Sequence, residues 1–127
     1  MHSDSSENDS GDLIEWRQAT SEDVVGMYGK LPKQTIRAIV VLRNGVPEGI
    51  AGVARERGVS KFFSDHKPEL KPFLKTITVL RAIKAAQQLL MRYPSVVMAE
   101  AQDDTGARLL GRLGFRHIEK EYFAWLG

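Results

Sequence analysis

The stretch TIRAIVVLRNGVPEGIAGVA, residues 35–54, decides which fold the sequence is expected to adopt. Its first half is rich in β-branched side chains, which favours a strand over residues 34–43. Asn44-Gly45 is typical of a tight hairpin turn, and a second apolar stretch follows over residues 49–54. We therefore predict a hairpin, extended into a three-stranded meander by the segment GVSKFFS at residues 58–64.

Upstream of the hairpin, the sequence predicts one strand, one short helix and a tail. Apolar and polar residues alternate over residues 13–19, which favours a strand with one buried face. Thr20 and Asp23 have the spacing of a capping box and predict that a helix begins there. Residues 1–11, MHSDSSENDSG, are polar and acidic, so we expect a disordered tail before a single domain at residues 12–127.

Downstream, two helices alternate with two extended segments. Apolar residues recur at three- to four-residue spacing over residues 73–93, which predicts the longest helix. The segment SVVMAEA at residues 95–101 is typical of a buried strand, and Asp103 or Asp104 caps a helix that Gly114 ends. Residues 115–126 form a last extended segment. The order β-α-β-β-β-α-β-α-β predicts an α/β (α+β) fold, a mixed and mostly antiparallel sheet flanked by helices.

The composition argues against several kinds of protein, among them disulfide-rich, metal-binding and membrane-spanning ones. The 127 residues include no cysteine and three histidines, which argues against disulfides, thiolate sites and a dedicated metal site. No apolar run approaches the roughly 20 residues of a membrane helix, and no signal peptide is evident, so we expect a cytoplasmic protein. Residues 1–12 carry four acidic side chains and no basic one, which leaves 18 basic and 12 acidic side chains in the rest.

Three local patterns together resemble the GNAT superfamily of acyl-CoA-dependent N-acyltransferases. Residues 14–23, IEWRQATSED, are similar to the opening strand and first helix of that family. Residues 41–53 are similar to its second and third strands, and residues 103–115, DDTGARLLGRLGF, to its late helix. The aromatic segment at residues 62–65 and the basic helix that follows look closest to compact GNAT-like proteins of tailed bacteriophages, which would place the protein in a host cytoplasm or a virion.

The resemblance implies an acetyl-CoA site, but two of its usual elements differ. The diphosphate loop of the family is glycine-rich, whereas HKPELKPFLKTI at residues 66–77 has no glycine and two prolines. Each proline removes a backbone donor where donors would be needed. In such a site Lys71 and Lys75 would contact phosphate as point charges and the Thr76 hydroxyl would meet it, while Asp103 takes the place of the family's cofactor-contacting Asn. The alternatives are solvated surface lysines, a helix-surface threonine and a helix N-cap at Asp103.

Catalysis would need a general base and a proton donor for the leaving thiolate. Glu100, at the end of the predicted strand 95–101, and Glu56, after the hairpin, are the candidate bases. In that family a tyrosine serves as the catalytic acid, and Leu110 stands at its position in this chain. Three tyrosines remain as substitutes, of which we interpret the first two as core aromatics: Tyr122, Tyr93 and Tyr28.

Three functional hypotheses therefore stay open, and whether the chain is an enzyme is undecided. The first is an N-acetyltransferase that uses acetyl-CoA and an unidentified amine. The second is a catalytically inactive GNAT-like phage protein with no cofactor and a structural or binding role among virion proteins. The third, which we regard as the weakest, is a nucleic-acid module on the basic stretch 55–84, with Phe62, Phe63 and Phe73 as stacking platforms.

Overall fold

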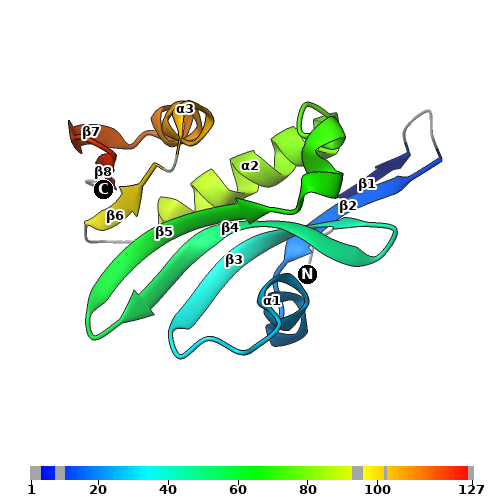
Figure 1. Cartoon of the computed structure of the whole chain (residues 1–127), viewed down its shortest axis with the longest axis horizontal. Coiled ribbons are helices and arrows are strands. Elements are labelled where there is room, and N and C mark those ends of the chain that lie inside the picture. Colours follow the sequence, from blue (N-terminus) through cyan, green and yellow to red (C-terminus); the bar gives the residue numbers. More distant parts are fainter. Residues whose placement is uncertain (1–3, 8–10, 93–95, 102, 126–127) are drawn as a thin grey trace.

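The computed structural model describes residues 4–7, 11–92, 96–101 and 103–125 (Figure 1). The strands are β1 (Asp4–Glu7), β2 (Leu13–Gln18), β3 (Thr35–Arg43), β4 (Val46–Glu56), β5 (Val59–His66), β6 (Val97–Glu100), β7 (Arg116–Glu119) and β8 (Tyr122–Trp125). The helices are α1 (Ser21–Tyr28), the 3-10 helix η1 (Pro68–Phe73), α2 (Ile77–Leu90) and α3 (Asp104–Leu113). None of the helices in these described segments is long and apolar enough to cross a membrane.

All eight strands form one sheet in the order β1-β2-β3-β4-β5-β6-β8-β7. Every neighbouring pair is antiparallel except β5 and β6, which are parallel. The predicted fold class, a mixed and mostly antiparallel sheet flanked by helices, is confirmed. The predicted hairpin is confirmed as well, since β3 and β4 pair from Thr35 with Arg55 to Arg43 with Val46.

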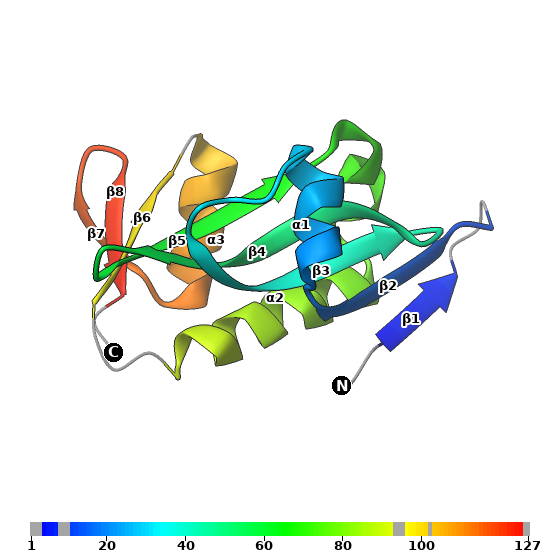
Figure 2. The ribbon, with the colours of Figure 1, turned by 90° about the horizontal axis from the view of Figure 1, so that it is seen from below.

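Helices cover both faces of the sheet, with α1 on one face and α2 and α3 on the other (Figures 1 and 2). The α1 side buries Val24, Ala38 and Ile50 in one apolar cluster. On the other side, one cluster lies under α2 and a larger one joins α2 and α3 to the sheet. The middle strands are therefore buried on both faces, which accounts for the near-continuous apolar run in β3.

A buried carboxylate joins β2 to α1. Asp23 is 3% exposed, and its oxygens accept two hydrogen bonds from the Arg17 guanidinium, at 2.7 and 3.0 Å. The same carboxylate accepts a hydrogen bond from the backbone N–H of Thr20 at 2.8 Å, while the Thr20 hydroxyl accepts one from the N–H of Asp23. The predicted capping box is confirmed, and Arg17 adds the charge that a buried carboxylate requires.

Three segments differ from the sequence prediction. Asp4–Glu7, within the segment expected to be disordered, forms β1 on the outer edge of β2, because backbone pairing does not require apolar side chains. Residues 115–126 contain a turn with Lys120 at φ 48°, which divides them into the hairpin β7–β8. The long helix begins at Ile77 instead of residue 73, because Thr76 caps it and Pro72 lies in η1. The predicted helix end at Tyr93 and Pro94 lies outside the described residues.

We expect Gly52→Ala to destabilise the sheet. A Cβ at Gly52 would lie 2.2 Å from the carbonyl oxygen of Arg37 and 2.5 Å from the Cα of Ala38, and both atoms belong to the backbone of β3. The free energy of unfolding should fall by about 2 kcal/mol or more. Gly111→Ala is the matched control, since its Cβ would meet nothing within 4 Å and alanine favours helix α3 by roughly 0.5–1 kcal/mol. Urea unfolding of both variants measures the difference, and equal midpoints would contradict the prediction.

Candidate functional site

The parallel strands β5 and β6 meet at a single register pair, Lys61 with Met98. Beyond this pair β5 continues to His66, whereas β6 ends at Glu100 (Figure 2). In the part of the chain that the structure describes, the β6-facing main-chain groups of β5 after Lys61 therefore have no strand partner. Unpaired N–H and C=O groups along a strand edge can bind a ligand that carries amide groups of its own.

Three backbone donors of the segment after β5 are used within the segment. The N–H groups of Leu70, Leu74 and Thr76 donate to carbonyl oxygens three residues earlier, at 3.0 to 3.4 Å. Pro68 and Pro72 have no N–H to offer. The absence of glycine thus has the predicted consequence, because this segment folds into η1 instead of a loop of outward-facing amides.

Leu70 packs η1 against the sheet. Its side chain is 1% exposed and lies over Gly49, where an added Cβ would come within 2.6 Å of Leu70 Cδ2. The Lys67 ammonium donates to the carbonyl oxygen of Gly26 at 3.1 Å, and the Lys67 N–H donates to the Glu48 carbonyl at 2.7 Å. The start of α2 is therefore held at a fixed place beside the end of β5.

Three of the four predicted cofactor-binding residues lie together at the η1–α2 junction. Lys71 and Lys75 are exposed. The Thr76 hydroxyl donates to the Phe73 carbonyl oxygen at 2.8 Å and accepts a hydrogen bond from the Val79 N–H at 3.4 Å, which makes Thr76 the cap of α2. Two lysine charges thus flank the N-terminus of a 14-residue helix, where the helix dipole also favours an anion.

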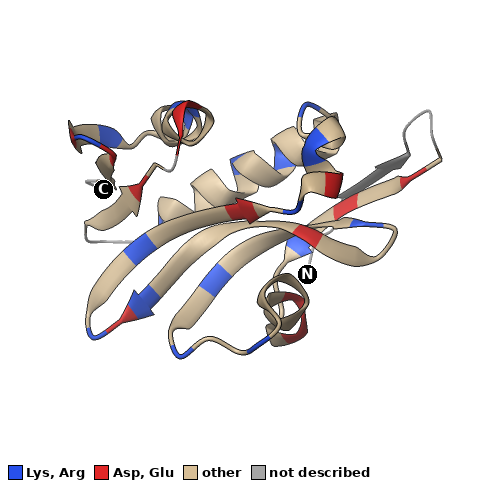
Figure 3. Cartoon of the chain, viewed as in Figure 1, with Lys and Arg blue, Asp and Glu red and all other residues tan. Residues whose placement is uncertain are grey.

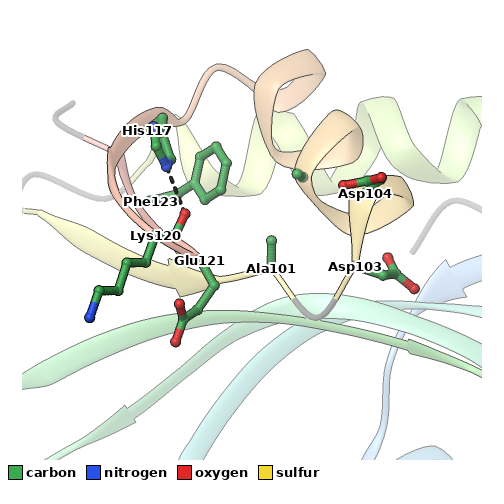
Figure 4. A pocket seen from close by; sticks show the side chains of 8 residues that line it. Ala101, Asp103, Asp104, His117, Lys120, Glu121 and Phe123 are labelled. Atoms are coloured by element: carbon green, nitrogen blue, oxygen red, sulfur yellow. Dashed lines mark hydrogen bonds between the residues drawn. The ribbon is translucent and has the colours of Figure 1, made fainter.

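Asp103, the fourth, begins α3 beyond the end of β6. Its carboxylate accepts a hydrogen bond from the Gly106 N–H at 2.7 Å, so it caps the helix. It lines an open cavity of about 400 Å³ between α3 and the β7–β8 hairpin (Figure 4). His117 lies across that cavity, with its Nε2 2.7 Å from the Lys120 carbonyl oxygen.

The two candidate bases lie apart. Glu56 ends β4 and pairs with Val59, at the start of β5. The eight residues of β5, roughly 25 Å of strand, separate it from the η1–α2 junction. Glu100 ends β6 where β5 and β6 diverge, and it is exposed. The side chain of its neighbour Ala99 packs in the apolar cluster under α2 and α3. Strand alternation therefore places Glu100 on the opposite face of the sheet, which carries α1.

A tyrosine lies beside Glu100. Tyr122 is its register partner on β8 and is 42% exposed, so our interpretation of Tyr122 as a core aromatic is wrong. The phenol lies on the uncovered α1 side of β8, where no helix packs against it. The charge of Glu121 and next that of Glu100 raise the pKa of Tyr122, so its phenol keeps its proton at neutral pH and is a weaker acid than an ordinary tyrosine. Leu110, in contrast, is 4% exposed in the core, and Tyr93 lies outside the described residues.

A second tyrosine–carboxylate pair lies near the end of β5, the other strand of the diverging pair. The Tyr28 hydroxyl, at the end of α1, donates to the carboxylate of Asp65 on β5. The Tyr28 ring lies 6.5 Å from that of Phe63, on the same face of β5. The sequence alone does not pair these two residues, because 37 positions separate them. The Tyr28-Gly29 helix end and the alternation of Phe63 with Asp65 were the available signals.

The stacking platforms of the nucleic-acid hypothesis belong to the core. Phe62 is 6% exposed and its ring lies 5.3 Å from that of Phe115. Phe63 and Phe73 are half-buried against the two other apolar clusters. No base could stack on Phe62 without opening the core, so the stretch 55–84 does not form an aromatic binding platform.

Comparison with solved structures shows the fold. An N-acetyltransferase from Staphylococcus aureus Mu50 has a TM-score of 0.56 at 11% identity, covering 87% of this chain and 94% of its own. The ribosomal-protein-S18-alanine N-acetyltransferase from Escherichia coli has a TM-score of 0.53 at 12% identity, covering 87% and 89%. An uncharacterized protein from Bacillus halodurans has a TM-score of 0.53 at 12% identity, covering 96% and 88%. The chain thus has the fold of GNAT N-acetyltransferases, while no family model and no curated protein matches its sequence.

We expect the Tyr28–Asp65 contact to make the protein sensitive to alkaline pH. Partial burial, followed by the hydrogen bond and charge of Asp65, raises the pKa of Tyr28 above its ordinary value of 10.0. The stabilising contribution is complete below that value and is lost as pH rises towards the folded-state pKa. Stability should therefore fall more steeply above pH 10 in the wild type than in Tyr28→Phe. Urea unfolding between about pH 8 and 11 measures both slopes, and identical slopes would refute the expectation.

Proposed function

We propose that the protein is an acyl-CoA-dependent N-acyltransferase that transfers an acetyl group to an amine. The observation that carries the proposal is the divergence of β5 and β6 after one register pair, in a chain with the GNAT fold. This divergence leaves a row of unpaired main-chain groups on β5, between the two helices that begin beyond β5 and β6. The donor supplies an activated thioester, whose carbonyl carbon is open to attack by an amine.

The donor's phosphates would be held by side-chain charge together with a helix start. Lys71 and Lys75 supply two ammonium groups, and the first turn of α2 supplies the positive end of its dipole. Thr76 and Asp103 act as positioning residues, since each caps a helix that borders the opening. This arrangement fits the diphosphate without glycines, because charge and helix direction replace the loop amides that η1 consumes.

The acceptor would approach from the side of the sheet that carries α1. The Glu100 carboxylate lies on that face at the end of β6, and it accepts the proton that the amine loses as the new C–N bond forms. Tyr122, its neighbour on β8, keeps its phenol proton at neutral pH and donates a hydrogen bond to the leaving thiolate as the C–S bond breaks, and the released thiolate takes its proton from water. Tyr28 and Asp65 border the opposite side and position the acceptor.

A virion role has less support than acyl transfer. The three similar structures named above are two N-acetyltransferases and an uncharacterized protein. The resemblance to phage proteins and the binding of virion partners stay predictions from the sequence. Glu56, at the opposite end of β5, has no part in the proposed site.

Titration calorimetry tests whether the donor binds. We expect acetyl-CoA to bind the wild type, and Lys71→Ala/Lys75→Ala to weaken binding at least tenfold, because two phosphate contacts are lost. Lys30→Ala/Lys84→Ala removes the same charge from exposed positions outside the site and should bind as the wild type does. An absence of heat with wild-type protein at about 1 mM acetyl-CoA would overturn the proposal.

A thiol-release assay tests the base. The chain has no cysteine, so every thiol detected comes from the donor. With whichever of spermidine, Nα-acetyl-lysine or a peptide with a free N-terminus is turned over, Glu100→Gln should lower kcat by about 100-fold and leave acetyl-CoA affinity unchanged. Glu56→Gln, at the opposite end of β5 and outside the proposed site, is the matched control. Equal rates for the two variants would exclude Glu100 as the base.

A further inference from the structure

Five basic residues lie toward the end of the sheet opposite the η1–α2 junction, where Figure 3 shows basic segments of the ribbon. They come from the loop before β3, from β3, from β4, from the β4–β5 turn and from β5: Lys33, Arg37, Arg55, Arg57 and Lys61. All five are exposed, and none forms an ion pair or a side-chain hydrogen bond within the described residues. We name this set the basic end of the sheet.

Strand register sets the spacing of these charges. Arg37 pairs with Val53, so Arg55 is its diagonal neighbour, at roughly 7 Å between backbones. Arg37 and Arg55 lie on the face of the sheet that carries α2 and α3, as Val53 does, and Arg57 follows Arg55 in the turn, whereas Lys61 pairs with Ala54 and lies on the α1 face. Glu56 is the acidic residue among them, which leaves four net positive charges within a few strand widths. Such a cluster is under mutual repulsion unless anions lie against it.

Arg57 occupies a backbone position that suits other residues better. Its φ is 51°, in the left-handed region, and Gly58 follows at φ 79°. The β3–β4 turn has the same pair of conformations with Asn44 at φ 54° and Gly45 at φ 81°, and asparagine is the residue favoured there. Arginine at this place carries a conformational cost, and no contact of its exposed side chain offsets it.

We propose that the basic end of the sheet binds the phosphate backbone of a double-stranded nucleic acid. Three of its five cations are guanidinium groups, which bind phosphate oxygens in bidentate geometry. Single-strand binding needs exposed stacking rings, and Phe62 and Phe63 are turned into the core. Phosphate contacts without base contacts give affinity that is independent of sequence.

The proposed surface is separate from the acyl-transfer site. Arg57 and Gly58 connect β4 to the start of β5, whereas Lys71 and Lys75 follow its end. The length of β5 lies between the two, so nucleic acid and acetyl-CoA can be bound at the same time. The result of a nucleic-acid binding test is therefore independent of whether the protein transfers acyl groups.

Arg57→Asn separates binding from folding. Asparagine fits the left-handed turn, so the variant should melt about 3 °C higher while it loses one phosphate contact. Lys120→Asn is the matched control, because Lys120 has φ 48° in the β7–β8 turn and loses the same charge at a distant place. Fluorescence anisotropy with labelled 20-base-pair DNA and RNA duplexes, at 25 to 200 mM salt, measures binding by the full chain.

We expect both duplexes to bind, with an affinity that falls steeply as salt rises. Arg57→Asn should weaken binding about threefold to tenfold, and Arg37→Ala/Arg55→Ala/Arg57→Asn should weaken it at least 30-fold and flatten the salt dependence. Acetyl-CoA affinity should not change. The proposal is overturned if the wild type fails to bind either duplex at 25 mM salt. It is also overturned if Lys120→Asn weakens binding as much as Arg57→Asn does, or if poly-glutamate of equal charge displaces the duplexes equally well.

Discussion

One register pair, Lys61 with Met98, joins strands β1–β5 to strands β6–β8. Because this pair uses only one residue of β5, the rest of that strand edge is free to diverge from β6. On its other edge β5 forms eight register pairs with β4, while β6 forms four with β8. Each strand is thus anchored on its outer side and free to diverge on the inner side. The join itself is made by side chains, because one apolar cluster contains Val53 and Phe62 from one part and Val97, Ala99 and Phe123 from the other. An apolar cluster can hold two strands together at one end while their main-chain groups separate at the other, which a continuous hydrogen-bond ladder cannot do.

Local signals predicted most of the fold. Asn44-Gly45, the Thr20–Asp23 spacing and Gly114 act within a few residues of themselves, so the hairpin, the start of α1 and the end of α3 could be inferred from the sequence. Strand β1 could not, because its pairing with β2 depends on backbone geometry and its sequence, DSSE, has no apolar side chain. The β7–β8 turn was missed because Lys120-Glu121 carries none of the residues that usually mark a left-handed turn.

Site residues that are close together in the sequence could be predicted as a group, whereas those brought together from distant segments could not. Lys71, Lys75 and Thr76 lie within six residues, so one segment was enough to propose them together. Glu56 and Glu100 both follow predicted strands, and the sequence alone could not distinguish the near end of β5 from the far end. Tyr28 and Asp65 meet only because α1 packs on the face of β5 that carries Phe63. The local signals at Tyr28-Gly29 and at Phe63 and Asp65 each place one residue on its element, but a single sequence does not show that the two elements meet.

Some charged side chains form buried ion pairs that stabilise the fold, and others are exposed and available to ligands. Asp23 and Glu48 are buried carboxylates, and each accepts two hydrogen bonds from an arginine, Arg17 and Arg43 respectively. Those two arginines neutralise charges that the interior would not otherwise accept, so their role is structural. The exposed cations have no such structural role, and two groups of them, Lys71 with Lys75 and the basic end of the sheet, lie at opposite ends of β5. A surface whose cations were only solubilising would intersperse both signs, as the remainder of this one does. Segregation into two groups, one beside a helix start and one around a strained turn, is what two separate anionic ligands would require.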